Sequence, residues 1–395
     1  MEQGDNVQAK IILTRARERF SDNDDVAFLL GMLAIEEKRF DYAIGYFREI
    51  LVRNPKAVRV RLELGRALFE NGDYRAADRQ FRFARSGNLP AVVMTNIDRY
   101  LSAIQSLQTF NWDVSVSLAP DTNINSAPSI EEISIFGLPF QLSEDAKRQT
   151  GIGLILNLSS DWTPYINGNN RLRIGGKIYR KDYPGGDFDD TIFNAHLGPQ
   201  FQLDGLKLRT LLTGFHRWYS NEPYNHGVGI RQELTFFSYS QAQLDTSLEH
   251  QWVNHNDVSS LDGTRTSWLA SGQVALTPSS GVVGVLGISR ESTELDILSN
   301  TRYRGGLGYY RELFGGLTTL LQPEYIHTRY DDVTPAFGVK RQDDLWRTRL
   351  RFKNRQWVFK GFTPELTLIH SSRRSNIDLY RYDRNQIQLG ISKLY

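Results

Sequence analysis

Apolar and polar side chains alternate along most of the chain, from about residue 111 to the C-terminus, in segments of roughly ten residues. The last segment, 386–395, places large apolar or aromatic side chains on one face: Ile387, Leu389, Ile391 and Tyr395. A period of two residues is typical of a strand with one apolar and one aqueous face. Because the pattern repeats without a helical interruption, it predicts a transmembrane β-barrel of the outer-membrane type.

The alternation divides residues 109–395 into about fourteen antiparallel strands, an even number, as in bacterial single-chain barrels. Short connections, often with glycine, take turns with longer polar ones. Such barrels have tight turns in the periplasm and long loops outside, so this phase predicts that both chain ends lie in the periplasm. The predicted strands lie near 111–119, 148–159, 170–181, 191–202, 205–219, 227–239, 241–254, 263–277, 281–290, 301–312, 316–330, 342–354, 357–370 and 383–395.

The predicted strand 342–354 shows most clearly which side chains face inward. Arg347, Arg349 and Arg351 alternate there with apolar or uncharged residues. An arginine on the lipid face costs roughly 2–4 kcal/mol at mid-bilayer, so all three are predicted to face the lumen. One interpretation is a charged lining that handles cargo. The other, favoured for any single residue, is a set of ion pairs that stiffen the wall, with partners such as Glu233, Asp245 and Glu249.

Residues 1–108 have helical periodicity instead, with a self-similarity of 34 residues. The spacing of small and bulky residues resembles the tetratricopeptide repeat, in which two antiparallel helices pack closely. Two full units are visible, and partial helices near 7–20 and 91–108 are predicted to cap them. An ordinary helical bundle is the less favoured alternative. The recurring residues are Leu30-Gly31 and Leu64-Gly65, Ala43 and Ala77, Phe47 and Phe81, and Pro55 and Pro90.

The inner face of such a repeat array is formed by the first helix of each unit. A mixture of apolar and charged side chains there suits an extended peptide or the flank of another protein. Packing of the same side chains on the barrel mouth or on the terminal helices is the alternative, and both stay open. The residues predicted on this face are Asp25, Phe28, Met32, Ile35 and Glu36 in the first unit and Arg59, Leu62, Arg66, Phe69 and Glu70 in the second.

Composition agrees with a barrel and narrows the function. The chain has 47 basic and 45 acidic residues, so its net charge indicates neither a nucleic-acid partner nor an acidic ligand. A mean hydropathy of −0.42 fits a barrel whose alternate residues face water. The absence of cysteine excludes disulfides, Cys-ligated zinc and thiol catalysis. No signal peptide is recognisable at Met1, so an exported form would be processed or recombinant.

No residue pattern predicts catalysis or a cofactor. The seven histidines lack the spacing of a zinc hydrolase, and neither a nucleophile elbow nor a phosphate-binding glycine loop is present. Asp121-x-Asn123-x-Asn125, with Glu132 after it, copies part of an EF-hand loop. Ser126 replaces the required glycine and a strand precedes the segment, so a capping turn of short polar side chains is favoured over calcium. We therefore expect a protein that is not an enzyme and has neither cofactor nor metal.

The segment 111–125, together with the order of a small repeat domain and a C-terminal barrel, resembles the Slam family of surface lipoprotein assembly modulators. The resemblance covers nearly the whole chain, and its motif residues are Trp112, Asp121, Asn123 and Asn125. It implies an outer-membrane translocator, also described as type XI secretion, that moves lipoproteins or related soluble proteins from the periplasm to the cell surface. It also implies a translocating barrel, and repeats that meet cargo, periplasmic chaperones or the barrel-assembly machinery.

Protein translocation is therefore the leading hypothesis for function. An exopolysaccharide exporter, which also joins tetratricopeptide repeats to an outer-membrane barrel, is the second. A general diffusion porin leaves the repeats unexplained, and an outer-membrane hydrolase comes last because no convincing nucleophile and base are present.

Overall fold

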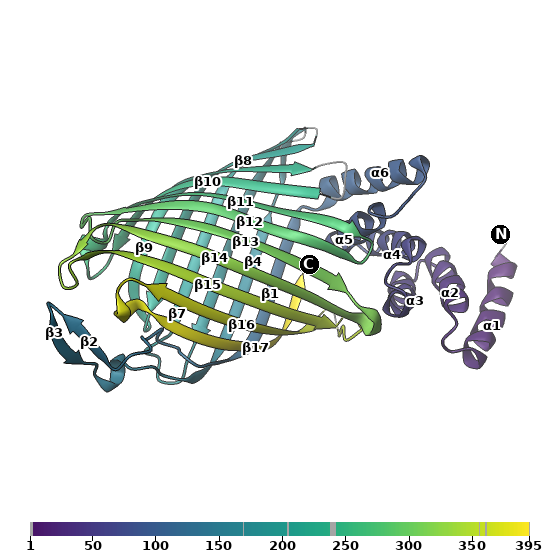
Figure 1. Ribbon diagram of the computed structural model, residues 1–395. Helices are drawn as coiled ribbons and strands as arrows, with labels where there is room; N and C mark the ends of the chain where they lie inside the picture. Colours follow the sequence, from purple (N-terminus) through teal and green to yellow (C-terminus); the bar gives the residue numbers. More distant parts are fainter. Residues whose placement is uncertain are drawn as a thin grey trace.

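The computed structural model describes residues 3–168, 170–203, 205–237, 242–354, 356–359 and 362–394 as a helical domain followed by a β-barrel (Figure 1). None of the described helices is long and apolar enough to cross a membrane. The helices are α1 (Gln3–Arg19), α2 (Asp24–Glu36), α3 (Phe40–Arg53), α4 (Val58–Glu70), α5 (Tyr74–Arg85) and α6 (Ala91–Leu107).

The repeated residues of the helical domain form its core. Gly31 on α2 faces the ring of Phe47 on α3, and a Cβ atom on Gly31 would lie 2.6 Å from that ring. Gly65 on α4 and Phe81 on α5 repeat this contact, with a corresponding distance of 2.9 Å. Both rings are buried. Glycine therefore lets the two helices of each unit approach, and the predicted tetratricopeptide architecture is confirmed.

The barrel is a closed antiparallel sheet. Its sheet has fifteen described strands, of which β5 (Tyr165–Asn167) is a short addition, and the other fourteen close through the β1–β17 and β4–β6 pairings. The predicted fold class and strand number are thus confirmed. The barrel strands are β1 (Phe110–Asp121), β4 (Gly151–Trp162), β6 (Asn170–Asp182), β7 (Asp190–Leu203), β8 (Leu206–Tyr219), β9 (Glu222–Phe237), β10 (Ala242–His255), β11 (Gly263–Thr277), β12 (Ser280–Thr293), β13 (Asn300–Glu312), β14 (Leu317–Thr334), β15 (Val339–Asn354), β16 (Thr363–Ser375) and β17 (Tyr382–Leu394).

The long connection after β1 contains a hairpin of its own. Strands β2 (Glu132–Ile135) and β3 (Leu138–Gln141) pair only with each other and lie at the barrel end far from the helices (Figure 1). Short 3-10 turns complete the connections: η1 (Glu144–Ala146), η2 (Ser259–Leu261), η3 (Phe314–Gly316) and η4 (Asp378–Tyr380).

The outer wall of the barrel is apolar. On β17 the exposed fractions of Ile387, Leu389 and Ile391 are 46%, 60% and 47%. At alternate positions of the same strand, Gln386 and Gln388 point to the other face, and the Gln388 side chain donates a hydrogen bond to Gln386 Oε1 at 2.9 Å. A wall with apolar exterior and polar interior is stable only in a bilayer, and a closed barrel of this kind is an integral outer-membrane protein.

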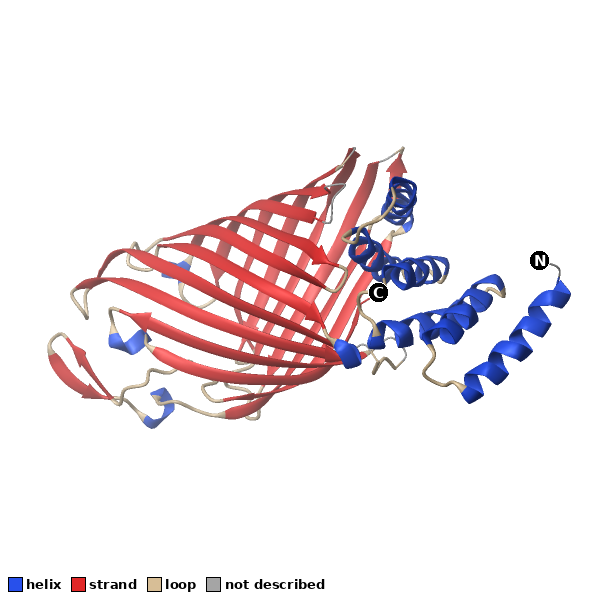
Figure 2. Cartoon of the chain, turned by 45° about the vertical axis from the view of Figure 1, so that its right-hand side comes forward, coloured by secondary structure: helices blue, strands red, loops and turns tan. Residues whose placement is uncertain are grey.

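All six helices lie at one end of the barrel, where both β1 begins and β17 ends (Figure 2). Tight connections such as 278–279 and 313–316 are at this end, whereas the connections 122–150 and 183–189 are at the other. Short turns face the periplasm in outer-membrane barrels, so the helical domain lies on the periplasmic side. We call the end of the barrel that carries the helical domain the inner mouth, and the opposite end the outer mouth.

Two strands begin five or more residues from their predicted starts. β9 begins at Glu222 rather than at 227, because Ser220 and Asn221 both have positive φ (54° and 63°) and close a two-residue turn. β16 begins at Thr363 rather than at 357, because the apolar residues Trp357 and Phe359 lie exposed in the connection before it. Residue Tyr395 and residues 238–241 lie outside the described residues, and with them one end of each of the predicted strands 227–239, 241–254 and 383–395.

Candidate functional site

Helices α4 and α5 contact the inner mouth of the barrel. Arg61 on α4 is fully buried, and its guanidinium forms an ion pair with Glu312, the last residue of β13. The same group donates hydrogen bonds to the carbonyl oxygen of Pro55 (2.6 Å) and to Oε1 of Gln80 (2.8 Å). Its Cζ atom lies 5.0 Å from the ring centroid of Phe83. All three guanidinium nitrogens have partners, which allows a charged side chain to remain buried.

A second ion pair joins α5 to a different part of the wall. Arg75 pairs with Asp113 on β1, and Asp113 also accepts a hydrogen bond from Ser159 on β4 at 3.2 Å. Beside the Arg61–Glu312 pair, the ring centroids of Phe83 on α5 and Tyr310 on β13 are 5.7 Å apart. Strands β14 to β17 separate β1 from β13 around the barrel. The two ion pairs therefore hold α4 and α5 across the inner mouth.

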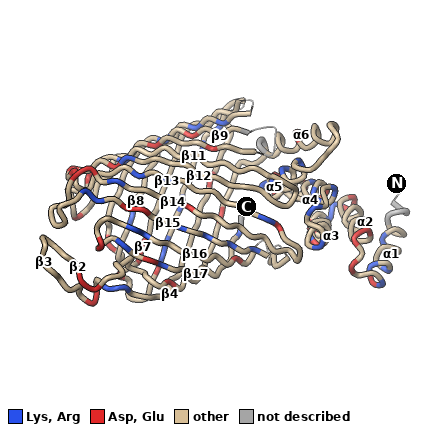
Figure 3. Tube along the Cα trace, in the orientation of Figure 1, with Lys and Arg blue, Asp and Glu red and all other residues tan. Residues whose placement is uncertain are grey.

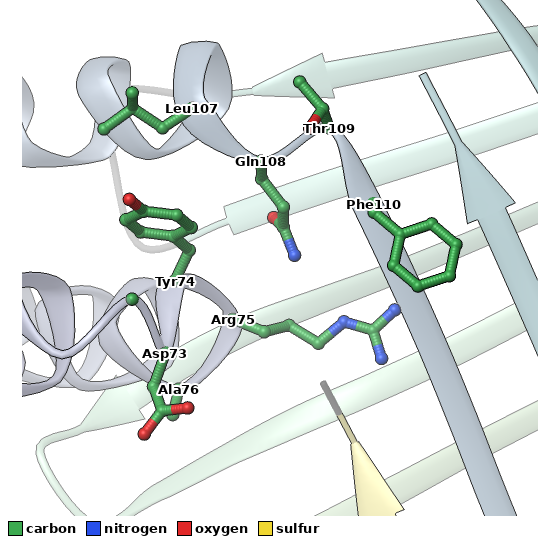
Figure 4. Close-up of a pocket in the computed structure, with 9 residues that line it drawn as sticks. Asp73, Tyr74, Arg75, Ala76, Leu107, Gln108, Thr109 and Phe110 are labelled. Atoms are coloured by element: carbon green, nitrogen blue, oxygen red, sulfur yellow. The ribbon is translucent and has the colours of Figure 1, made fainter. Parts of the chain in front are cut away.

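A cleft of about 200 Å³ opens beside Arg75, between the start of α5 and the junction of α6 with β1 (Figure 4). Figure 4 shows the Arg75 side chain extending from α5 toward β1, the strand that carries Phe110. The cleft has room for a side chain of an extended peptide rather than for a folded domain. Its lining consists of Gly72, Asp73, Tyr74, Arg75, Ala76, Leu107, Gln108, Thr109 and Phe110.

Charged residues recur along the barrel strands (Figure 3), and many form ion pairs on the lumen side. Arg173 on β6 lies 2.7 Å from Asp161 on β4 and 2.7 Å from Glu233 on β9. Asp245 instead accepts hydrogen bonds from Thr235 and Gln243. These contacts fit the interpretation of lumen charges as a stiffening network. Other pairs of this kind are Arg209–Glu233, Arg231–Glu249, Arg265–Glu291 and Arg304–Glu324.

The three arginines of β15 have lumen-side partners of different kinds. Arg347 lies 3.4 Å from Glu324, and Arg351 lies 3.0 Å from Glu365. Arg349, between them, donates a hydrogen bond to the neutral amide of Gln322 at 3.3 Å and pairs with no described carboxylate. Arg349 is thus the arginine of this set with the least compensated charge.

Three of the four motif residues, Asp121, Asn123 and Asn125, lie at the outer mouth. Asp121 is buried, and its carboxylate accepts hydrogen bonds from Arg384 (2.9 Å and 3.0 Å), from Gln386 (3.0 Å) and from the hydroxyl of Tyr183 (3.0 Å). It also accepts from the backbone N–H of Asn123 at 3.0 Å. The first strand, the last strand and the β6–β7 connection therefore meet at one carboxylate.

The two asparagines that follow hold the turn after β1. The Asn123 side chain accepts from the N–H of Ala127 and donates to its carbonyl oxygen, both at 2.9 Å. Asn125 donates to the carbonyl oxygen of Lys147 at 2.7 Å. These contacts form a capping turn of short polar side chains, as the sequence favours. Trp112 lies far along β1, near the inner mouth, where Lys393 Nζ is 5.4 Å from its ring centroid.

The residues predicted on the inner face of the repeats divide into three groups by exposure. Ile35 is buried in the helical core, so it is not an exposed contact residue as predicted. Arg59 and Arg66 are exposed, and the Arg59 guanidinium lies 5.0 Å from the ring centroid of Phe28 in the other unit. The acidic residues Asp25, Glu36 and Glu70 are exposed as well. The remaining four are partly buried against the core: Phe28, Met32, Leu62 and Phe69.

The residues that dock the helices on the barrel were missed by the sequence reasoning. Arg61 lies three residues before Leu64 and seven before Leu68, so it shares their buried face of α4. A charged residue at helical spacing from buried leucines is the signal that could have identified it. Nothing in the sequence identifies Glu312 as the partner of Arg61, or Asp113 as the partner of Arg75, because both acidic residues are ordinary strand residues.

Comparison with known proteins decides the family. Residues 110–395 match the family described as "Surface lipoprotein assembly modifier", and residues 5–81 match its N-terminal TPR repeats. The chain belongs to the surface lipoprotein assembly modifier family. Among its relatives in that family, Surface lipoprotein assembly modifier 1 of Neisseria meningitidis serogroup B is 27% identical over 377 residues, 92% of this chain and 75% of the relative.

Two further relatives show the breadth of the similarity. Surface lipoprotein assembly modifier 2 of Haemophilus influenzae is 23% identical and covers 99% of this chain and 82% of its own length. The Hemophilin secretion modulator of Acinetobacter baumannii is 23% identical and covers 92% and 77%.

Solved structures similar to the chain cover mainly its barrel. A loop L8 deletion mutant of OmpT, an outer membrane protein of Vibrio cholerae, matches with a TM-score of 0.41 and 6% identity, covering 73% of this chain and 99% of that one. An anion-selective porin from Comamonas acidovorans matches with a TM-score of 0.40 and 9% identity, with the same coverage.

Proposed function

We propose that this surface lipoprotein assembly modifier is a translocator that moves lipoproteins, or related soluble proteins, from the periplasm to the cell surface. The observation that carries the proposal is the docking of the repeat domain on the inner mouth through Arg61–Glu312 and Arg75–Asp113. In this arrangement the repeats, for which we propose cargo binding, stand directly before a lumen with a polar lining. Export by the barrel requires no catalytic residue, and we propose that the protein is not an enzyme.

Capture is the first step of the proposed mechanism. The exposed side chains Arg59 and Arg66 and the partly buried Phe28 and Met32 form a surface of mixed charge and apolar character on α2 and α4. Such a surface suits an extended peptide segment, because apolar contact gives affinity and charge selects the partner. Periplasmic chaperones that keep cargo unfolded would deliver such a segment, and the barrel-assembly machinery would insert the barrel itself.

Entry into the lumen is the second step. Helices α4 and α5 lie across the inner mouth, so cargo bound to the repeats has to shift them before it passes. The cleft beside Arg75 is a place where an extended segment can begin to separate α5 from β1. Among the three arginines of β15, Arg349 is the one best suited to attract an acidic cargo segment, because it is bound to a neutral amide.

The names of two relatives indicate the class of cargo. One is a surface lipoprotein assembly modifier and another is a hemophilin secretion modulator. A lipoprotein and a secreted protein are both polypeptides, which favours protein over polysaccharide as the cargo of this chain.

Surface display in a heterologous host tests the function. The chain is co-expressed with a lipoprotein encoded beside it in its own genome, and exposure of that lipoprotein is measured by protease treatment of intact cells. We expect display with the intact chain and none after deletion of residues 1–108, with heat-modifiable migration of the barrel as the control for insertion. Unchanged display after the deletion would refute the role of the repeats.

Two further outcomes separate the alternatives. A polysaccharide synthase encoded beside the gene, with no lipoprotein displayed, would favour an exopolysaccharide exporter. A large and stable conductance of the intact chain in planar bilayers would favour a diffusion porin, because docked helices are expected to keep the inner mouth covered.

A further inference from the structure

The junction between β1 and β17 differs from every other junction in the barrel wall. All other neighbouring strands in the described barrel follow one another along the chain, whereas β1 and β17 come from opposite ends of the barrel domain. A hairpin or loop limits how far two strands can separate. The β1–β17 seam has no such covalent connection, so hydrogen bonds and side-chain contacts alone hold it closed.

The hydrogen-bonded ladder of this seam is interrupted in its outer half. β1 pairs with β4 continuously from Phe110 to Asp121, but it pairs with β17 over residues 113–118 and again at Asp121, leaving a gap at 119–120. The N–H of Thr122 donates across the seam to Asn385 at 3.0 Å. Strand amides alternate in direction, so Pro120 occupies a position whose N–H would donate across the same seam.

Proline also interrupts two other ladders of the barrel, beside Pro199 and Pro323. Those ladders join β7 to β8 and β13 to β14, which are consecutive strands with short connections. At Pro199 and Pro323, the missing hydrogen bond weakens two strands that a short connection still holds together. At Pro120, it weakens two strands that no connection joins.

Over most of its length, the lumen face of the seam has none of the ion pairs that cross many other junctions of the wall, a feature that it shares among the described residues with β1–β4, β10–β11 and β12–β13. Between Asp113 and Asp121, no ion pair among the described residues crosses from β1 to β17, whereas pairs such as Arg351–Glu365 join neighbouring strands elsewhere. On the outer face, the aliphatic side chains of Leu118 and Leu389 are exposed. The lumen-facing residues along the seam are small or uncharged: Ser115, Ser117, Ala119, Gln388, Gly390 and Ser392.

Polar contacts across the seam gather at its outer end. Asp121 on β1 binds both Arg384 and Gln386 on β17, and the Asn123 side chain donates to the carbonyl oxygen of Asp383 at 3.4 Å. These contacts lie directly beyond the ladder gap. The Asp121–Arg384 pair is thus placed to act as a latch for the outer half of the seam.

We propose that the β1–β17 seam opens laterally when the Asp121–Arg384 latch is released, and that acyl chains of a lipidated cargo pass through it from the lumen into the membrane. The proposal rests on the translocation function above and adds a route for the lipid. Acyl chains are excluded from water and favoured in hydrocarbon, so a side exit delivers them to the bilayer while the polypeptide leaves by the outer mouth.

A disulfide across the seam tests this route, because the chain has no cysteine of its own. Ser115 and Ser392 lie directly opposite each other on β1 and β17, so Ser115→Cys with Ser392→Cys locks the seam on oxidation. The matched control is Ser267→Cys with Ser289→Cys, another opposed pair of lumen-facing serines, on the tethered strands β11 and β12. Mass spectrometry confirms that each disulfide has formed.

Two forms of one cargo are followed by protease treatment of intact cells: the lipoprotein encoded beside the gene, and its variant with the acylated cysteine replaced by serine. With the seam oxidised, we expect at least a tenfold loss of display of the lipidated form, recovery on reduction, and unchanged export of the unlipidated form. The β11–β12 control should export both. Equal loss of both forms, or loss of neither, would overturn the acyl route. A wild-type chain that exports neither form would overturn the translocation function itself.

A measurement without cargo tests the seam separately. In vesicles of phosphatidylethanolamine and phosphatidylglycerol, we expect backbone amides of residues 115–119 to exchange with deuterium at least tenfold faster than those of residues 267–271. Asp121→Asn should raise the first rate and leave the second unchanged. Equal protection of the two segments, or no effect of the substitution, would overturn the proposed opening.

Discussion

The Arg61 guanidinium and the Glu312 carboxylate form a buried ion pair although 251 residues separate them along the chain. Arg61 belongs to the second repeat and Glu312 to the end of β13. A charge pair removed from water in this way is specific rather than strongly stabilising, because desolvation offsets most of the Coulomb attraction. Its consequence here is orientation: the repeat domain fits the barrel in the one position where both charges are paired.

Replacing Arg61 by alanine should loosen the docking of α4 and α5. The substitution leaves Glu312 buried without its cation, which typically costs about 3–5 kcal/mol. We expect faster hydrogen exchange throughout α4 and α5, and cleavage of the α6–β1 junction by added protease. Arg66→Ala on the same helix is the control, since Arg66 is exposed and its nearest carboxylate is 3.8 Å away. Equal protection in the Arg61 and Arg66 variants would contradict a docking role.

Alanine substitution of two glycines on neighbouring helices should change the stability of the helical domain in opposite directions. Gly31→Ala pushes a methyl group against Phe47, at 2.6 Å before relaxation, and overpacking of this kind costs about 1–3 kcal/mol. Gly45→Ala meets no atom within 4 Å and removes a helix-destabilising residue, so it should stabilise by about 0.5–1 kcal/mol. Urea denaturation followed by helical circular dichroism measures both. Effects of the same sign would show that the Gly31–Phe47 contact does not control the packing.

Acid should weaken the attachment of α1. Burial raises the pKa of Glu49, but hydrogen bonds from Arg17 (2.5 Å) and Arg53 (2.8 Å) outweigh it and hold this pKa below the ordinary value of 4.5. Because the folded-state pKa is depressed, the contribution of Glu49 to stability is complete above the ordinary value. It is lost as the pH falls through the lower, folded-state pKa.

The measurement is the urea midpoint of the helical domain as a function of pH. We expect the midpoint to fall as the pH is lowered below 4.5, the ordinary pKa of Glu49, and the fall to be smaller in Glu49→Gln. Glu18→Gln, on α1 itself, serves as the control because no hydrogen bond to its side chain is found in the described part of the chain. A Glu49 variant with the same acid dependence as the wild type would refute this assignment.

The turn at the outer mouth should depend on Asn123. Alanine there removes the side-chain partner of both backbone groups of Ala127 and leaves them buried, at a cost of about 1–3 kcal/mol. We expect faster proteolysis of the connection 122–150 in intact cells, while the barrel keeps its heat-modifiable migration. Asn256→Ala, in the outer connection 256–262, is the comparison, because the Asn256 side chain is exposed and no hydrogen bond from it is found in the described part of the chain. Similar proteolysis in both variants would argue against a capping role for Asn123.

Local patterns predicted the elements well because each strand carries its own evidence. The two-residue period located all fourteen barrel strands, since the bilayer outside and water inside impose it on each strand separately. It failed at β16, where Trp357 and Phe359 continue the alternation into an exposed connection. It also failed before β9, where Ser220 and Asn221 form a tight turn that a polar composition does not reveal. Ile35 was misplaced because helical spacing alone does not say which of two neighbouring faces is covered.

What the sequence by itself determined is therefore the architecture: a repeat domain, a barrel, and the side of the wall that each strand residue faces. These follow from periodicity, which is a property of nearest neighbours along the chain. Which charges meet was decided only by the tertiary structure. Arg61 finds Glu312, and Asp121 finds Arg384, after closure of the barrel brings its two ends together, and no local pattern encodes a contact between residues more than two hundred positions apart.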